Sequence, residues 1–578
     1  MRIWPSPYWP PEITSNIPDY KFPLHHLLDE AADNFPHQVF TIFQGAQRTY
    51  SQVRKAADKT ATFLQKSGIR KGDKIAIFLP NLPQYPEILF GIVKAGAVAV
   101  LCNPVYTPHE LRHQLRDSES RMVFCMDHPE FYPAAVEAIQ GTQVENVIVC
   151  NIKSYLPKFK ALVGGILGKI PKAPRMDTAH LDFDTIQEET PAHPTPVDID
   201  PEKDTTIMLY TGGTTGAPKG AELVHTNFTY NAVAGYEFIR LAQAPKKGPE
   251  RLHKGGVHTH LGILPWYHTF GLTAGLLSAI ISAGRMVCIP DPRAGKPAFT
   301  EVLASIEKYR ATLMPAVPTL FSVLIHHPRL ADFDLSSLMG CFSAGSPLAP
   351  EVCRQFEEKT GSVIFEGYGM TETAPVVTLN PTNAKTRKIG SIGFPLPGTW
   401  VKILDVNDPR IEKERGQDGE VAACGPQVMK GYWNNSEAND KAFVTIDEDR
   451  YFLTGDIGHI DEDGYVHITD RKKDMIIVGG FNVYPRDVED ILYTHPKVEL
   501  TAVVGIPDAK SGESVKAFIK LKQGEEASEE EIKAFCQEKM TPYKRPRRIE
   551  FREEIPTSNV GKVLRRVLKD EETRTTTP

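Results

Sequence analysis

The sequence lacks paired cysteines: its eight cysteines stand singly along 578 residues, with no C-x-x-C pair. This spacing indicates a reducing compartment and argues against structural zinc. Residues 1–7 lack the apolar core of a signal peptide. No uninterrupted apolar run of about 18 residues occurs, so a membrane-spanning helix is not expected. The sequence therefore predicts a cytoplasmic protein and leaves open a peripheral contact with the inner face of the membrane.

An excess of positive charge is also absent. The 66 lysines and arginines are outnumbered by 72 aspartates and glutamates, which gives a net charge of −6. Bulk charge therefore gives no reason to expect nucleic acid as a partner. A hydrophobic content of 41% is ordinary for a globular protein, and the length predicts several domain-sized units instead of one core.

What the sequence does contain is a glycine- and threonine-rich stretch at residues 210–220 (YTGGTTGAPKG), which begins at the end of the apolar run 207–210. Its glycines let backbone N–H groups approach an anion, and its threonines and Lys219 offer hydroxyls and a positive charge to phosphate oxygens. The stretch therefore predicts a polyphosphate-binding loop after a buried strand, with a plain surface turn as the alternative. A Walker A loop is excluded because Lys219 follows Pro218 and precedes Gly220.

Apolar segments that indicate buried strands alternate with helical patterns. Residues 74–80 indicate a strand and residues 85–95 a helix, and this order recurs along the first half of the chain. Such alternation predicts a parallel sheet with helices on its faces. Residues 363–365 are expected to form a strand that leads into a loop at 366–373, and loops of this kind should converge on one site.

The predicted fold class is α/β. We expect a large N-terminal domain at residues 1–470, built from doubly wound α/β subdomains and a small β-rich subdomain at about 400–470. A hinge at 471–475 should lead into a small, mobile α+β C-terminal domain at 476–578, because the charged run 470–474 separates two different patterns.

Six motifs follow one another in a fixed order over nearly the whole chain. They are TGGTTGAPKG (211–220), LPWYHTFG (264–271), GYGMTETAP (367–375), YFLTGDIG (451–458), DRKKDMIIVGGFNVYP (470–485) and NVGKVLRRVL (559–568). With these motifs the chain resembles the adenylate-forming (AMP-binding) acyl-CoA synthetases, most closely the bacterial long-chain fatty acid–CoA ligases. The resemblance implies ATP- and Mg²⁺-dependent ligation of a medium- or long-chain fatty acid to coenzyme A through an acyl-adenylate, with release of AMP and pyrophosphate.

The resemblance also implies a nucleotide site. Glu372 and Thr211 are expected to position Mg²⁺, a hard ion that prefers oxygen ligands. Tyr368 offers a flat face to adenine, Asp456 can accept hydrogen bonds from the ribose, and Arg471 should hold the ribose or the α-phosphate. The expected nucleotide-binding residues are Thr211, Gly212, Gly213, Thr214, Thr215, Gly216, Lys219, Ala344, Gly345, Gly367, Tyr368, Gly369, Thr371, Asp456 and Arg471.

The C-terminal domain should contribute to both half-reactions. By resemblance, Lys562 reaches the α-phosphate and the carboxylate during adenylation. The domain is then expected to rotate about a hinge near Lys473, so that Gly479 and Gly480 line the channel for coenzyme A. The expected catalytic residues are Lys562, Glu372, Thr211 and Lys219.

Trp266 and His268 are expected beside the acyl pocket, again by resemblance. A lone histidine is more often structural, so His268 is not predicted to be a general base. The basic stretch 246–260 (KKGPERLHKGGVHTH) reads as an insertion before Leu261 and leaves the acyl chain length open.

Residues 155–172 are apolar and basic, with no acidic residue. This segment is either an interfacial patch for anionic lipid or a loop or short helix folded onto its own domain. A homodimer is left open as well. Competing functions are an aryl- or other carboxylic acid–CoA ligase, transfer of the acyl group to a carrier protein, and a non-catalytic acyl or nucleotide sensor. The intact site residues argue against the sensor.

Overall fold

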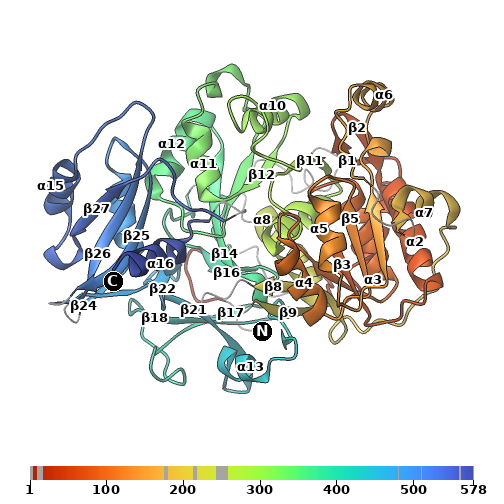
Figure 1. The fold of residues 1–578 in the computed structure, drawn as a ribbon. Coiled ribbons are helices and arrows are strands. Elements are labelled where there is room, and N and C mark those ends of the chain that lie inside the picture. The colour runs from red at the N-terminus through yellow and green to blue at the C-terminus, as the bar shows by residue number, and fades with distance from the viewer. Residues whose placement is uncertain are drawn as a thin grey trace.

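The computed structural model describes residues 4–9, 17–174, 180–211, 218–241, 258–383, 385–478, 481–508, 511–558 and 562–576. Four sheets organise these residues (Figure 1). The first three lie in the part of the chain before residue 472, and the fourth lies after it. The predicted α/β fold class is confirmed.

One sheet has eight strands, and its central strands are parallel. The loop expected to bind phosphate lies between two of its strands, β8 and β9, which pair antiparallel. Its spatial order is β19 (Gly431–Tyr432), β9 (Lys219–Val224), β8 (Thr205–Thr211), β4 (Val98–Leu101), β3 (Lys74–Phe78), β5 (Met122–Met126), β6 (Asn146–Cys150) and β7 (Leu181–Asp182).

A second sheet has nine strands and is parallel from β1 to β14. Antiparallel strands complete both edges. Its spatial order is β16 (Phe394–Pro395), β15 (Val376–Leu379), β14 (Val363–Gly369), β13 (Gly340–Ser343), β12 (Leu313–Ala316), β10 (Thr259–Gly262), β11 (Arg285–Cys288), β1 (Val39–Phe43) and β2 (Ala46–Thr49).

The two remaining sheets are small and mostly antiparallel. One contains β17 (Trp400–Leu404), β18 (Gly419–Cys424), β21 (Asp449–Ile460), β20 (Phe443–Ile446) and β22 (Val466–Arg471). The other contains β24 (Phe481–Val483), β23 (Ile476–Val478), β26 (Gly512–Leu521), β25 (Val498–Asp508) and β27 (Arg548–Phe551). In Figure 1 the latter lies at the left, apart from the eight-stranded sheet.

Helices fill the connections between these strands. In the first half of the chain they are α1 (His26–Asn34), α2 (Tyr50–Lys66), α3 (Gln84–Lys94), α4 (Pro108–Asp117), α5 (Phe131–Ala138), the 3-10 turn η1 (Lys153–Tyr155), α6 (Lys158–Ile166), α7 (Phe183–Glu189), α8 (His225–Leu241), the π-helix η3 (Gly271–Leu277) and α9 (Ser278–Ile281). They continue with α10 (Thr300–Tyr309), α11 (Pro318–Ile325), α12 (Pro350–Thr360), the 3-10 turn η5 (Thr371–Thr373), α13 (Ser436–Ala442), α14 (Pro485–Tyr493), α15 (Glu529–Lys539) and α16 (Arg565–Thr576).

Several of these helices begin where the local sequence supplies a cap. Thr49 accepts a hydrogen bond from the amide of Gln52, whose side chain accepts one from the amide of Thr49, and this reciprocal pair starts α2. Helix α2 packs closely on α3, because a Cβ atom added to Gly91 would lie 2.5 Å from Cβ of Thr60. Glycine at 91 therefore allows the two helices to touch.

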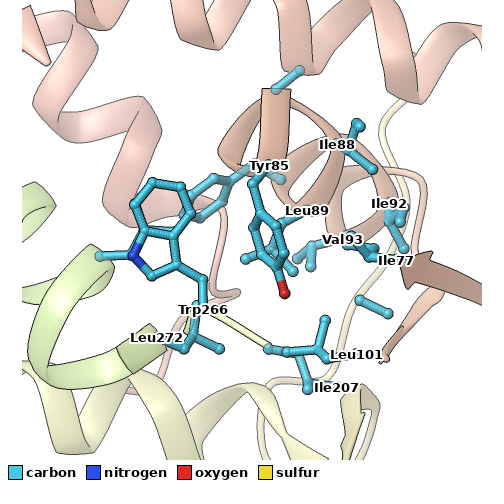
Figure 2. Close-up of a cluster of buried hydrophobic side chains, with 14 of the residues drawn as sticks. Ile77, Tyr85, Ile88, Leu89, Ile92, Val93, Leu101, Ile207, Trp266 and Leu272 are labelled. Carbon is cyan, nitrogen blue, oxygen red and sulfur yellow. The ribbon is translucent and has the colours of Figure 1, made fainter. Parts of the chain in front are cut away.

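Figure 2 shows where the two large sheets share a core. Tyr85 of α3 meets the indole ring of Trp266 edge-on, with the ring centres 5.6 Å apart. Trp266 follows β10 of the nine-stranded sheet, yet it is buried in the cluster that covers β3, β4 and β8. The two sheets therefore form one packed body, and the site residues at their strand ends are held on a common base.

The structure differs from the sequence-based expectations at β14. The strand does not stop at residue 365 but continues through Gly369, because Gly367 and Tyr368 pair with Leu379 and Thr378 of β15. A distant segment supplies this partner strand, so the local pattern could not reveal it. None of the helices in the described ranges is long and apolar enough to cross a membrane.

Candidate active site

The carboxyl end of β14 carries one group of predicted site residues. Tyr368 lies between Gly367 and Gly369, and the turn η5 follows with Thr371 and Glu372. Neither glycine tolerates a side chain. A Cβ atom at Gly367 would lie 2.3 Å from the Phe342 ring, and one at Gly369 would lie 1.8 Å from a backbone oxygen. Close packing on both sides therefore fixes the position of Tyr368.

Tyr368, Asp456 and Arg471 form a connected polar group. The Tyr368 hydroxyl donates a 2.7 Å hydrogen bond to Oδ2 of Asp456, and Nε of Arg471 lies 3.3 Å from Oδ1. Asp456 and Arg471 also face each other across the β21–β22 pair. Each carboxylate oxygen keeps a free lone pair, so Asp456 can still accept hydrogen bonds from a ribose.

Lys562, although distant in sequence, is placed beside this group. Burial and the positive charge of Arg471 lower the pKa of Lys562 to about 7, while the carboxylate of Asp456 acts in the opposite direction. Lys562 also affects the predicted pocket residue His268. Burial, together with this lysine, lowers the pKa of the imidazole to about 4. The segment that contains Lys562 and the segment that contains Asp456 therefore meet at one site. His268 is neutral near pH 7 because its pKa lies well below that pH.

Arg565, three residues after Lys562, holds the surrounding chain. Its Nε lies 3.0 Å from Oε1 of Glu489 in α14, and its Nη1 lies 3.6 Å from carboxylate oxygens of both Asp470 and Asp474. Asp470 is the penultimate residue of β22, and Asp474 falls inside the predicted hinge. The Lys562 segment is therefore tied to the residues that flank the expected pivot.

The predicted phosphate loop lies mostly outside the described residues, which exclude Gly212, Gly213, Thr214, Thr215 and Gly216. Its two ends are described. Thr211 and Lys219 pair across β8 and β9, and the Thr211 hydroxyl lies 3.5 Å from the Lys219 carbonyl oxygen. The hairpin therefore brings a hydroxyl and a cation to the same end of the sheet.

Tyr432 links this hairpin to Glu372. Its hydroxyl donates a 2.8 Å hydrogen bond to Oε1 of Glu372, and the Lys219 ammonium lies 5.0 Å from the centre of its ring. The segment before it is fixed as well, since the amide of Met429 donates to the carbonyl of Glu372 over 2.8 Å. Sequence reasoning missed Tyr432, because a tyrosine after glycine in KGYWNN carries no recognisable signal.

Burial raises the pKa of the Glu372 carboxyl, whereas the hydrogen bond from Tyr432 lowers it. A buried carboxylate is most stable next to a cation. Glu372 and the hydroxyl of Thr211 are oxygen donors of the type that Mg²⁺ prefers, and phosphate and water oxygens can complete its shell. The residues present therefore fit a magnesium ion.

An apolar cavity is lined in part by Val376, four residues after Glu372. Asn231 of α8 lines it and donates hydrogen bonds to the carbonyls of Thr373 and Val376, just after Glu372. Its other end lies among His260, Leu313 and Gly340, which pair at one level of β10, β12 and β13. Further lining residues are Ala232, Gly235, Tyr236, Ile239, Thr273, Ala274, Ser278, Met314, Pro315, Phe342, Phe365, Val376 and Leu379.

The predicted pocket residues Trp266 and His268 do not line this cavity. Trp266 is fully buried between the two large sheets (Figure 2), and its indole N–H has no partner among the described residues. Nδ1 of His268 accepts a 3.3 Å hydrogen bond from the amide of Phe270. The lining of this cavity comes from five strands and the helical segments α8, η3 and α9, so no single motif could have revealed it.

The remaining predicted residues lie at the edge of the site or outside the described ranges. Ala344 is buried directly after β13, and Gly345 has a φ of +88°, which favours glycine. Lys473 follows β22, and burial lowers the pKa of its ammonium, with Arg471 acting in the same direction. Gly479 and Gly480 lie outside the described residues.

Comparisons with known proteins identify the family of the chain. The family described as AMP-binding enzyme matches residues 28–433, and the AMP-binding enzyme C-terminal domain matches residues 487–562. The long-chain-fatty-acid–CoA ligase of Bacillus subtilis is 38% identical, with 99% of this chain and 98% of that protein covered. The enzyme of the same name from Salmonella typhimurium is 37% identical with the same coverage.

Solved structures show the same fold. The anthranilate CoA ligase AuaEII, crystallised with anthranoyl-AMP, has a TM-score of 0.83 and 26% identity over 97% of this chain and 99% of that one. ATP-bound MatB from Rhodopseudomonas palustris has a TM-score of 0.77 and 27% identity over 96% of this chain and all of that one. The chain therefore belongs to the AMP-binding enzyme family, as its motifs predict.

Proposed function

We propose that the chain is an acid–thiol ligase that joins a fatty acid to coenzyme A in an ATP-dependent reaction. The reaction would pass through an acyl-adenylate and release AMP and pyrophosphate. The observation that carries this proposal is the apolar cavity. Its lining residue Asn231 donates a hydrogen bond to the carbonyl of Thr373, the residue after Glu372, and the lining continues along the nine-stranded sheet. Two relatives of the same name, similar over 99% of the chain, support a fatty acid as the substrate.

In the first half-reaction a carboxylate oxygen attacks the α-phosphorus, and the bond to the pyrophosphate oxygen breaks. Both reactants are anions, so the site must neutralise charge and hold an in-line approach. Lys562 would supply a cation at the α-phosphate, where its flexible stem can reach both reactants. Asp456, fixed by Tyr368 and Arg471, would hold the ribose hydroxyls.

The triphosphate would lie against the β8–β9 hairpin, with Lys219 and residues 211–216 on the β- and γ-phosphates. Thr211 and Glu372 would hold a magnesium ion, which neutralises phosphate charge when bound. Tyr432 would keep the Glu372 carboxylate turned toward this ion, since its hydroxyl occupies Oε1.

In the second half-reaction the thiol sulfur of coenzyme A attacks the acyl carbon, AMP leaves, and the thiol proton passes to solvent. We infer that the part after residue 475 rotates about the hinge at 471–475 for this step, with Lys473 near the pivot. Gly479 and Gly480 would then line the channel for the pantetheine chain.

Three finer expectations also remain proposals: a cytoplasmic location, a homodimer, and a peripheral contact with the membrane. The peripheral membrane contact is supported by one feature of the described residues, the helix α6. Its residues Phe159, Leu162 and Ile166 are exposed.

The proposed reaction is tested by pyrophosphate release with MgATP across acetate, decanoate, palmitate and benzoate, each with and without coenzyme A. We expect release to peak with the longer aliphatic acids and to be sustained only with coenzyme A. A preference for benzoate would move the substrate to aryl acids. No release with any of these acids would contradict the proposal and favour a non-catalytic sensor.

A further inference from the structure

Helix α6 buries none of its own residues. Three of its large apolar side chains are exposed: Phe159 to 75%, Leu162 to 63% and Ile166 to 76%, and Leu167 directly after it to 58%. Spacings of three and four place the first three on one face of the helix. Figure 1 shows α6 at the outer edge of the fold next to β2, on the side away from the C-terminal sheet. Water therefore covers an apolar stripe that an ordinary surface helix would turn inward.

The helix is held in place at both ends by buried contacts. Before it, Tyr155 is buried, and its hydroxyl donates a 2.5 Å hydrogen bond to Glu87 in α3. The guanidinium of Arg48 lies 5.1 Å from the centre of the Tyr155 ring and 2.8 Å from Glu87. After the helix, the buried amide of Ala173 donates to Oδ1 of Asp127 over 2.7 Å. The buried contacts before and after α6 therefore hold this exposed helix at the surface of the protein.

All charged residues of the segment 155–172 are lysines. Lys158, Lys160, Lys169 and Lys172 are exposed in this segment, and residues 155–172 include no aspartate or glutamate. Lys160 is turned toward the protein, where its ammonium donates to the carbonyl of Gln44 over 2.9 Å. The other three lysines flank the apolar side chains, a combination that suits the headgroup region of an anionic bilayer.

We propose that α6 with Leu167 is a membrane-docking surface that inserts its apolar stripe among the lipids of an anionic bilayer. The lysines would lie at the headgroups, while Phe159, Leu162, Ile166 and Leu167 enter the boundary of the acyl chains. The surface is too short to span, and the contact is reversible, because a few apolar side chains anchor less strongly than a spanning helix. Docking through this surface does not depend on the proposed activity.

A second copy of the chain is a poorer partner for this surface. A two-fold contact places the same patch on both sides of the interface. It would bring the lysines of one copy against those of the other without an acidic residue from 155–172 to offset them. A lipid headgroup supplies the missing negative charge.

The test is sedimentation of the full chain with vesicles of equal phosphatidylcholine and phosphatidylglycerol, compared with phosphatidylcholine alone. We expect binding to the mixed vesicles that weakens with added salt. The variant Phe159→Ser with Leu162→Ser and Ile166→Ser should bind about tenfold more weakly, because the apolar contact is lost. Replacing Lys158, Lys169 and Lys172 by glutamine should reduce binding to the level seen with phosphatidylcholine alone.

Met339→Ser with Ile411→Ser is the matched control, since these side chains are 58% and 54% exposed elsewhere on the surface. It should bind vesicles like the unchanged protein. Equal vesicle binding by the triple serine variant, or no binding by the unchanged protein, would overturn the docking surface. Sedimentation velocity without vesicles gives a further check. If the unchanged protein is a dimer and the serine changes dissociate it, that result would also overturn the docking surface. Pyrophosphate release with decanoate should be the same in the serine variant as in the unchanged protein. If none of the proteins releases pyrophosphate, the result would count against the proposed activity and not against the docking surface.

Discussion

The hydroxyl of Tyr432 donates a hydrogen bond to Oε1 of Glu372 over 2.8 Å, and the same aromatic ring lies 5.0 Å from the ammonium of Lys219. Tyr432 therefore contacts both an expected metal-binding carboxylate and an expected phosphate-binding lysine. Burial, together with the Glu372 charge, raises the pKa of the Tyr432 hydroxyl, so it remains a donor across the physiological range. Its position explains how two residues from different motifs keep a fixed relationship.

Removing the Tyr432 hydroxyl should make the reaction require a higher concentration of Mg²⁺. In Tyr432→Phe the carboxylate of Glu372 loses its donor, and a hydrogen bond to a charged group is worth roughly 1.5–3 kcal/mol. We expect the Mg²⁺ concentration for half-maximal pyrophosphate release to rise on the order of tenfold. Calorimetric titration of ATP binding at graded Mg²⁺ gives a second readout. Tyr465→Phe, which loses a buried hydroxyl that donates to the Thr386 carbonyl, is the control. An unchanged Mg²⁺ requirement would rule out this role.

Lys562→Ala should separate the two half-reactions. Acyl-adenylate formation is expected to fall on the order of a hundredfold or more, because one charge that stabilises the transition state is lost. Thioester formation from supplied acyl-AMP should be spared. Lys569→Ala, on α16 and half exposed, is the control for a lost lysine in the same part of the chain. Equal losses in both steps would remove the basis for assigning Lys562 to adenylation.

The pH dependence of adenylation should also report on Lys562. Burial and Arg471 lower the pKa of its ammonium to about 7, so the charged form dominates only below that pH in the free enzyme. We expect kcat/KM for ATP, which reflects the free enzyme, to fall as the pH rises from about 6 to 9. In Lys562→Arg the guanidinium stays charged, so this fall should disappear. The same decline in both proteins would assign it to another group.

The length of the cavity should be adjustable at Gly340. A Cβ atom at this position would lie 3.0 Å from the Phe365 ring, at the end of the cavity far from Glu372. Gly340→Val should therefore lower kcat/KM for palmitate by about tenfold or more, since pockets discriminate by this amount for one or two methylenes. Acids of half that length should be little affected, and thermal unfolding checks the fold. Equal losses for short and long acids would place the acyl chain elsewhere.

Much of the fold could be predicted because its signals are local. The apolar run 74–80 became β3, and the segment 207–210 became the core of β8. Helix α2 begins at a capping box formed by residues three apart. By contrast, residues 271–277 form a π-helix, and nothing in their apolar sequence distinguishes a π-helix from an α-helix.

The site was less predictable because it is assembled from distant segments. The motifs identified Tyr368, Asp456, Arg471 and Lys562, and the structure brings these four together. The cavity could not be deduced, since its lining residues come from five strands and three helical segments that lie far apart in the sequence. Tyr432 was not predicted for a related reason. Its position beside Glu372 and Lys219 depends on the pairing of β19 with β9, which no local sequence pattern indicates.

The pairing of β19 with β9 limits how this protein can be taken apart. Gly431 and Tyr432 add the outermost strand to the sheet that carries the β8–β9 hairpin, and the amide of Trp433 also donates to the Gly220 carbonyl over 2.8 Å. A truncation before residue 431 would leave an open edge on β9, which is a template for aggregation. A chimera that exchanges residues 400–470 with a relative must therefore match β9 as well. In such a chimera the β8–β9 hairpin and the segment 429–433 should therefore come from the same parent.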